Sequence, residues 1–193
     1  MWIDVPKKDG LYDPNCAVAV VLKYIYQQES FVYHELNRAA RFNDHSKLPT
    51  LGPFAYAFHH VIGFSQEFRT DIDPAQFRKC TLWRGAGMTN KEIQEFKSNV
   101  GKRRIQLFGC TSTSTSKDQA KSFAWESKTT GHHKVLFQIN WDDQFFHYYL
   151  NAGAYDYEQE IVLEDAASLF VLEVKEIFNK KDVYQHTLIV LGS

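Results

Sequence analysis

The chain has 193 residues, of which 44% are hydrophobic and 23% are charged, and its formal net charge at pH 7 is −1. These values are ordinary for a soluble globular protein and exclude a disordered chain. The near-zero charge also argues against a broad basic surface, so no nucleic-acid partner is expected.

Two further classes of protein are excluded by short sequence features. The longest apolar run, residues 16–22, has seven residues, whereas a helix that spans a bilayer needs about 20, so no membrane span is expected. Cys16, Cys80 and Cys110 are too few for a disulfide framework, and each is expected to be a small buried hydrophobe. The N-terminal segment lacks the features of a secretory signal, which favours a cytoplasmic protein if the chain is full-length.

The first third of the chain has the patterns of three helices. They are predicted over residues 12–28, 30–43 and 53–64. Asp13 and Ser30 are suitable N-caps for the first two, because their side-chain oxygens can accept hydrogen bonds from unpaired backbone amides. The third follows Pro53, since proline is tolerated at the start of a helix, and Gly63 is expected to end it.

From about residue 80 the pattern changes to strands with two intervening helices. Strands are predicted over 80–87, 104–114, 134–141, 159–165, 169–178 and 184–191, and helices over 91–99 and 117–127. The second strand is expected to run into a polar turn, and Thr89 with Glu92 has the spacing of a capping box, as has Ser116 with Gln119. This order indicates an α+β fold with a largely antiparallel sheet. One domain is expected over 1–193, helical over 1–70 and mainly β over 71–193.

Two carboxylates open the strand predicted at 159–165. Glu158 and Glu160 are two positions apart, so in an extended chain their side chains point to the same face, about 7 Å from each other. Such a pair is usually part of a charged solvent face. Here the opposite face is apolar and Tyr155 and Tyr157 crowd the approach, so at least one carboxylate is expected in a partly dry cleft.

The run TSTSTS at residues 111–116 has, in isolation, the composition of a polar loop and a helix N-cap. It follows the apolar residues Leu107 and Phe108, so its first hydroxyls are expected to project from the end of a strand. Hydroxyls in that position can orient a neighbouring carboxylate.

Arg84 lies between Trp83 and Gly85 in the strand predicted at 80–87. A partly buried guanidinium needs an anionic partner, which could be a structural Asp or Glu and could equally be a phosphate. The basic cluster at 101–106 is interpreted as a solvated turn, with phosphate contact as the lesser alternative.

Other kinds of site have little support in the sequence. The glycines at 85 and 87 lack the third glycine and the βαβ context of a dinucleotide fingerprint. Adjacent histidines, as at 59–60 and 132–133, do not place two rings on one face, and no metal site is expected. No G-x-S-x-G elbow of a serine hydrolase occurs.

Taken in chain order, these motifs resemble those of a known family. Arg84, then Ser112, then Glu158 and Glu160 follow the pattern of the R-S-E class of mono-ADP-ribosyltransferases, which includes bacterial toxins and the vertebrate arginine-specific ecto-enzymes. The segment FVYHELNRAAR looks like the helical N-terminal region of the vertebrate-type branch. Trp83 departs from the pattern, in which tyrosine is commoner at that position.

The resemblance implies a pair of antiparallel sheets packed across a cleft that holds extended NAD, with helices around them. It implies that Arg84 contacts a phosphate or ribose of NAD and that the backbone of Gly85 meets the nicotinamide amide. It also implies that Ser112 holds Glu160, the catalytic carboxylate, in place. No metal is implied.

The serine run allows two registers of this resemblance. Ser112 is taken as the family serine because Ala120 then falls six residues after Ser114, which is the usual spacing, and Ser114 is the alternative. Thr113 and Ser114 are expected at the NAD site together with Ser112.

The resemblance assigns Glu158 to the acceptor, where a glutamate goes with arginine in this family. Cleavage of the nicotinamide glycosidic bond passes through an oxocarbenium-like state that the carboxylate of Glu160 can stabilise. A guanidinium is protonated at ordinary pH, and a second carboxylate can bind it and accept its proton. Tyr155 and Tyr157 could stack on the acceptor arginine or simply pack at the strand entrance.

The leading hypothesis is an NAD-dependent mono-ADP-ribosyltransferase that modifies exposed arginines of proteins and releases nicotinamide. One alternative is an NAD glycohydrolase that uses the same residues with water as the acceptor. Another is a non-catalytic domain that binds NAD, ADP-ribose or a protein. If the chain is a mature form or a fragment, a secreted effector or surface enzyme is expected instead of a cytoplasmic protein.

Overall fold

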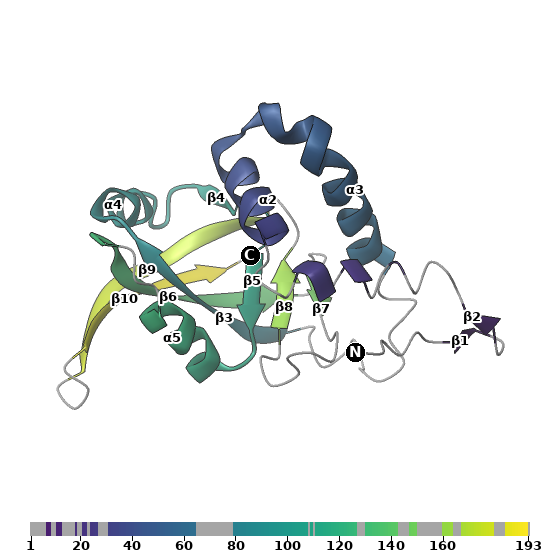
Figure 1. The fold of residues 1–193 in the computed structure, drawn as a ribbon. Coiled ribbons are helices and arrows are strands. Elements are labelled where there is room, and N and C mark those ends of the chain that lie inside the picture. The colour runs from purple at the N-terminus through teal and green to yellow at the C-terminus, as the bar shows by residue number, and fades with distance from the viewer. Residues whose placement is uncertain are drawn as a thin grey trace.

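Helices lie mainly in the first third of the chain and strands in the remainder, in the order that the sequence indicates (Figure 1). The computed structural model describes residues 7–8, 11–12, 18, 21–22, 24–26, 31–64, 79–107, 109, 111–126, 130–142, 147–149, 160–163, 167–179 and 184–192. Within these residues, no helix combines the length and the apolar character that crossing a membrane requires.

The helical region contains α2 (Phe31–Phe42), a 3-10 turn (His45–Lys47) and α3 (Leu48–Phe64). Residues 18, 21–22 and 24–26 are helical as well, so all three predicted helices have a counterpart. The caps proposed at Asp13 and Ser30 lie outside the described residues.

The predicted start of the third helix is wrong, because α3 begins at Leu48 and contains Pro53. Asp44 accounts for the earlier start. Its carboxylate accepts hydrogen bonds from the backbone nitrogen of Ser46 at 3.2 Å and from the Ser46 hydroxyl at 2.6 Å, which caps the turn that leads into α3. Pro53 then removes one backbone hydrogen bond from a helix that has already begun. The bounds of α3 extend through Gly63 to Phe64, so Gly63 lies inside the helix and does not end it as expected.

The main sheet has eight strands in the order β4-β9-β10-β6-β3-β5-β8-β7, and β1 pairs separately with β2. The strands are β1 (Lys7–Lys8), β2 (Leu11–Tyr12), β3 (Lys79–Met88), β4 (Arg104–Leu107), β5 (Thr111–Ser114), β6 (His133–Asp142), β7 (His147–Tyr149), β8 (Glu160–Leu163), β9 (Ala167–Asn179) and β10 (Tyr184–Gly192). Neighbours are antiparallel except β6 and β10, which run parallel. The α+β class is confirmed.

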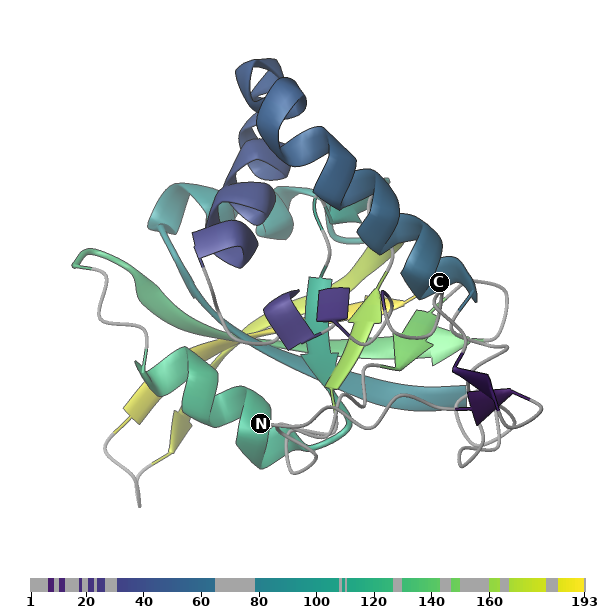
Figure 2. The same ribbon diagram turned by 45° about the vertical axis from the view of Figure 1, so that its right-hand side comes forward.

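The two sheets that the resemblance implies are two portions of this ladder, joined at one point. β3 and β5 pair only through Trp83 and Ser114. On one side of that pair lie β4, β9, β10, β6 and β3, and on the other side lie β5, β8 and β7. The two portions run in different directions (Figures 1 and 2).

The segment predicted as one strand over 104–114 is two strands at distant places in the sheet. β4 lies at one edge, whereas β5 lies between β3 and β8, and Gly109 between them has a φ of 78°. The prediction of one continuous strand is therefore wrong, although strand structure at TSTS agrees with the predicted range. Its polar side chains are accommodated in a buried strand because they form hydrogen bonds, as when the Thr113 hydroxyl donates to the Ile161 carbonyl at 2.6 Å.

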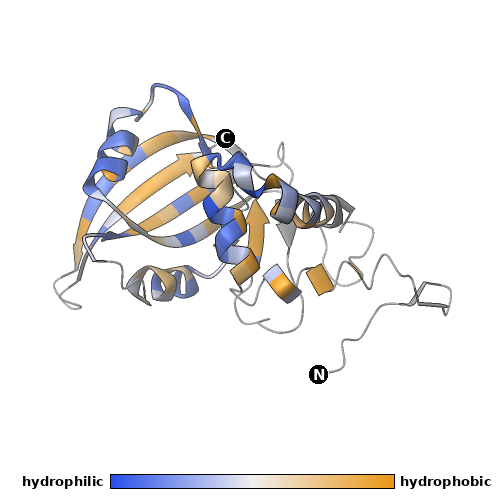
Figure 3. Cartoon of the chain, turned by 45° about the horizontal axis from the view of Figure 1, so that its top comes forward, coloured by the Kyte–Doolittle hydropathy of each residue, from blue (hydrophilic) through white to orange (hydrophobic). Residues whose placement is uncertain are grey.

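β8 is buried along its whole length because it lies between two apolar clusters. Ile161 and Leu163 belong to the cluster formed with β3, β6, β9, β10 and α4 (Asn90–Ser98). Val162, on the alternate face, packs with Tyr26 and Phe58 of the helical region. Figure 3 shows hydrophobic residues concentrated along these strands. Glu160 shares the face of Val162 and therefore points toward the helical region.

α4 and α5 (Lys117–Glu126) begin at the caps that the sequence predicts. The Thr89 hydroxyl accepts a hydrogen bond from the Glu92 backbone nitrogen at 3.3 Å, and the Glu92 carboxylate accepts one from the Thr89 nitrogen at 2.7 Å. At α5, the Ser116 hydroxyl accepts a hydrogen bond from the Gln119 nitrogen at 3.3 Å.

Cys80 fits the expectation of a small hydrophobe, because it is half-buried against the larger apolar cluster. Burial raises the pKa of its thiol, which keeps the thiol neutral and weakly nucleophilic. Cys16 and Cys110 lie outside the described residues.

Candidate active site

The alternation of β3 places Arg84 and Gly85 on opposite faces of the sheet. Arg84 is paired with Phe137 of β6, and its side chain lies on the face that α4 covers. One of its terminal nitrogens donates a hydrogen bond to the Ser112 carbonyl at 2.7 Å. Among the described residues no ion pair of Arg84 is found, and its guanidinium is anchored by a neutral carbonyl. The Asp or Glu partner considered from the sequence is not found in that part of the chain.

Ser112 and Glu160 meet on adjacent strands. Ser112 is paired with Val162 in the β5–β8 ladder and Ser114 with Glu160, so the side chains of all four share one face. The Ser112 hydroxyl donates a hydrogen bond to the Oε1 atom of Glu160. Only 7% of Glu160 is exposed, and a buried carboxylate of this kind requires such donors.

The contacts of the two candidate family serines are as follows. The Ser112 hydroxyl contacts Glu160, and the Ser114 hydroxyl accepts a hydrogen bond from the Ser116 backbone nitrogen at 2.9 Å. Thr113 faces the other way and bonds the Ile161 carbonyl. Ser114 therefore fixes the turn into α5, and Ser112 orients the carboxylate.

Gly85 lies in close contact with α5. A Cβ atom at this position would lie 1.9 Å from the carbonyl oxygen of Ala120 and 2.6 Å from the backbone nitrogen of Ala124. A side chain here is excluded by main-chain atoms, so the glycine has a packing reason that is independent of any ligand.

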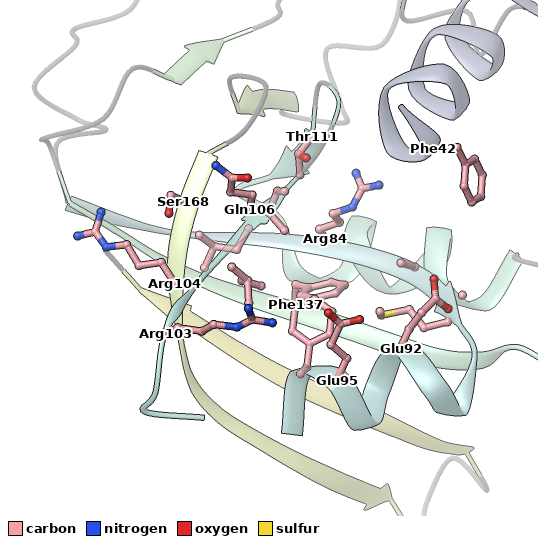
Figure 4. Close-up of a pocket in the computed structure, with 17 residues that line it drawn as sticks. Phe42, Arg84, Glu92, Glu95, Arg103, Arg104, Gln106, Thr111, Phe137 and Ser168 are labelled. Carbon is pink, nitrogen blue, oxygen red and sulfur yellow. The ribbon is translucent and has the colours of Figure 1, made fainter. Parts of the chain in front are cut away.

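Arg84 also lines a cavity of about 700 Å³, here called the β4 cavity, between β3, β4 and α4 (Figure 4). Its polar lining consists of Arg84, Glu92, Glu95, Arg103, Arg104, Gln106, Thr111 and Ser168, and its aromatic lining of Phe42, Phe96 and Phe137. Ser112 and Glu160 are not part of this lining. Arg84 thus stands between the cavity and the Ser112–Glu160 pair, since it contacts both the cavity and Ser112.

Most residues of this cavity have no local signal in the sequence. Phe42, Gln106 and Ser168 come from separate elements, and only the fold brings them together. The exceptions are Arg84, Thr111 and the basic cluster at 101–106. Arg103 lines the cavity and is held by a hydrogen bond from its Nε to the Asn99 side-chain oxygen at 2.7 Å, whereas Arg104 lies over the Phe170 ring at 4.9 Å.

Three of the residues expected at the acceptor side lie outside the described part of the chain: Tyr155, Tyr157 and Glu158. Their roles stay predictions. The described residues bring together Arg84, Ser112 and Glu160, which come from three different strands.

Comparison of the sequence with protein-family models and with curated proteins gives no match. Comparison with solved structures gives several. The ADP-ribosyltransferase Vis of Vibrio splendidus, solved in complex with agmatine, matches with a TM-score of 0.64 and 18% identity over 91% of this chain and 74% of Vis. HopU1 of Pseudomonas syringae, also an ADP-ribosyltransferase, matches with a TM-score of 0.61 and 17% identity over 83% of this chain and 64% of HopU1.

A third match is the ADP-ribosylating toxin BECa of C. perfringens, solved with NADH, with a TM-score of 0.65 and 11% identity. The match covers 91% of this chain and 43% of BECa, so the chain corresponds to less than half of that toxin. The neighbours include ADP-ribosylating toxins, and the resemblance to the vertebrate branch stays a prediction. At these identities the likeness shows the fold. The chain has the ADP-ribosyltransferase fold.

Proposed function

We propose that the chain is an NAD-dependent mono-ADP-ribosyltransferase that transfers ADP-ribose to arginine side chains and releases nicotinamide. The observation that carries the proposal is the buried Glu160 carboxylate, held by the Ser112 hydroxyl, with the Arg84 guanidinium bound to the carbonyl of the same serine. The carboxylate and the guanidinium thus lie near the same strand. A substrate that develops a cationic sugar centre needs the negative charge, and its diphosphate needs the positive charge.

The residues present fit NAD as the substrate. Arg84 offers a planar cation without a carboxylate partner among the described residues, and such a fork suits a phosphate. The β4 cavity, at about 700 Å³, is within the usual range of about 300–1,000 Å³ for small-molecule sites. With the diphosphate at Arg84, the nicotinamide ribose extends toward Glu160 and the adenosine half toward the β4 cavity. That BECa was solved with NADH supports this choice of ligand.

The chemistry needs few protein groups. The bond between the nicotinamide nitrogen and C1′ of the ribose breaks, and its electron pair leaves with nicotinamide, which becomes neutral without a proton from the protein. The ribose develops oxocarbenium character, and the carboxylate of Glu160 stabilises that positive charge. The Ser112 hydroxyl fixes the orientation of the carboxylate beforehand, so little reorganisation is needed in the transition state.

Arginine as the acceptor is supported by two observations. The sequence has a second glutamate, Glu158, two positions before Glu160, where the family resemblance links glutamate with arginine. Vis was solved with agmatine, which carries the guanidinium group of an arginine side chain. In the proposed transfer, Glu158 binds the guanidinium and accepts its proton as the terminal nitrogen attacks C1′. Tyr155 and Tyr157 are proposed to stack on it.

The function is tested by incubation of the protein with labelled NAD and agmatine, with nicotinamide release and ADP-ribosylated agmatine measured in parallel. Formation of the adduct at the rate of nicotinamide release is the expected result. Nicotinamide release without adduct at saturating agmatine would replace the transferase by an NAD glycohydrolase. NAD binding without cleavage would replace it by a non-catalytic binding domain.

Replacement of Glu158 by glutamine is expected to separate transfer from hydrolysis. Transfer to agmatine should fall by about 10²- to 10⁴-fold, the usual contribution of general base catalysis, because the amide cannot accept the guanidinium proton. Hydrolysis of NAD should fall far less, because water does not need the same binding group. The ratio of adduct to free ADP-ribose measures the effect, and equal loss of both products would remove the acceptor role from Glu158.

A further inference from the structure

Phe42, at the end of α2, is exposed to solvent in an unusual place. Its side chain is 76% exposed, and yet it lines the β4 cavity (Figure 4). Phe31, at the other end of α2, is about as exposed but does not line the cavity, whereas Tyr26 and Phe58 stack on each other at 4.4 Å between centroids. Among the described residues, Phe42 makes no aromatic contact of this kind. An apolar face at the mouth of a cavity is therefore available to a ligand.

The backbone holds Phe42 in this position. Asn43, the next residue, has a left-handed φ of 52°. The backbone nitrogen of Asn43 donates to the Ala40 carbonyl at 3.3 Å, and that of Asp44 donates to the Ala39 carbonyl at 2.9 Å. These two bonds form a Schellman motif, which ends α2 abruptly at Phe42. The backbone that carries the ring is thus set before a ligand arrives, so the entropy cost of binding is limited to the side chain of Phe42.

Phe42 faces the same space as the Arg84 side chain, which rises from β3 toward α2 (Figure 4). A nucleoside diphosphate whose phosphates bind Arg84 carries its ribose and base into the cavity mouth. There the flat π-face of a purine and the exposed phenyl ring can stack. The rim also offers Gln106 and Ser168 as hydrogen-bonding groups, but neither has a flat apolar face.

We infer that Phe42 stacks on the adenine of NAD and sets the affinity for the dinucleotide, while the chemical step depends on other residues. The inference rests on the proposed function, because it takes NAD as the ligand and Arg84 as its phosphate anchor. It adds a residue that has no signal in the sequence and no place in the family resemblance on which the site was first predicted.

The test compares two ligands by isothermal titration calorimetry: ADP-ribose, which contains the adenine, and nicotinamide mononucleotide, which does not. Phe42→Ala is expected to weaken ADP-ribose binding by about 5- to 150-fold, which corresponds to about 1–3 kcal/mol for a stacked base. Binding of nicotinamide mononucleotide should be unchanged. Phe42→Tyr retains the ring and should bind ADP-ribose with the affinity of the natural chain.

Turnover gives a second measurement. In Phe42→Ala the KM for NAD should rise, whereas kcat should be unchanged.

Phe31→Ala is the matched control, because Phe31 lies at the other end of α2, is 74% exposed and does not line the cavity. It should bind ADP-ribose as the natural chain does. Wild-type affinity of Phe42→Ala for ADP-ribose, or no ADP-ribose binding by the natural chain, would overturn the inference. If NAD is cleaved and Phe42→Ala leaves the KM for NAD unchanged, the inference is contradicted and the proposed function is not. If Phe42→Ala weakens ADP-ribose binding but the natural chain does not cleave NAD, the proposed transferase function is contradicted and the inference is supported.

Discussion

The Glu160→Gln variant is expected to cleave NAD about 10²- to 10³-fold more slowly than the natural chain, which is the usual loss when one electrostatic contact to a transition state is removed. The amide is isosteric with the carboxylate, and its oxygen can still accept the Ser112 hydrogen bond. What disappears is the negative charge beside the developing oxocarbenium centre. The loss should therefore appear in kcat, with a KM for NAD close to that of the natural chain.

The same variant should be at least as stable as the natural chain. Glu160 is 7% exposed, and burial of a charged carboxylate costs desolvation energy that a neutral amide avoids. Thermal unfolding followed by circular dichroism would measure this. Glu173→Gln is a suitable control, because Glu173 is an exposed carboxylate of β9 paired with Lys175 at 2.7 Å, far from the site in the strand order. It removes the same charge and should leave turnover unchanged. Full NAD cleavage by Glu160→Gln would show that the catalytic carboxylate has been assigned to the wrong residue.

The order of elements could be predicted from the sequence because periodicity and caps are local properties. The strand predicted over 134–141 corresponds to β6, in which Val135, Phe137 and Ile139 share one face, and the Thr89–Glu92 box predicted the start of α4. The strand order of the sheet is not local. β4 and β5 are close in sequence but lie five places apart in the sheet, and the parallel pairing of β6 with β10 has no signature in either strand. The three-residue β7 was missed for a similar reason, since so short a segment shows no period.

Only the site residues that belong to the motifs of the family resemblance could be predicted. Arg84, Ser112 and Glu160 were singled out as motifs, and the fold brings them into contact. Hydrophobic patterning alone would have assigned TSTS to a loop, because the strand is polar and its burial depends on partners in β3 and β8. Phe42 could not be found at all from sequence, because an aromatic residue at the end of an amphipathic helix ordinarily belongs to the core. Only the turn at Asn43 and the position of β4 make it part of a cavity.

The Gly85→Ala variant is expected to lose stability rather than lose a ligand contact. The added methyl group would lie 1.9 Å from the Ala120 carbonyl oxygen and 2.6 Å from the Ala124 nitrogen, whereas real Cβ atoms keep at least 3.0 Å from such neighbours. α5 must move away from β3 to admit it. Overpacking of this kind usually costs about 1–3 kcal/mol, and for a chain of this size each kcal/mol lowers the Tm by about 2–4 °C. A fall in Tm of up to about 12 °C in a thermal melt is the expected result.

Gly52→Ala provides the matched control, because Gly52 lies inside α3 and a Cβ there has no neighbour within 4 Å. Alanine is favoured over glycine in a helix by about 1 kcal/mol, whereas a Cβ on the residue before Pro53 is disfavoured there, so this variant should melt close to the natural chain. The atoms that oppose a side chain at Gly85 belong to the main chain of α5, so Ala120→Gly should not rescue Gly85→Ala. If Gly85→Ala melts at the temperature of the natural chain, or if Ala120→Gly restores its melting temperature, then α5 lies farther from β3 than in the structure. If Gly85→Ala melts at a lower temperature and also cleaves NAD more slowly, then Gly85 serves the site by letting α5 approach the strand that carries Arg84.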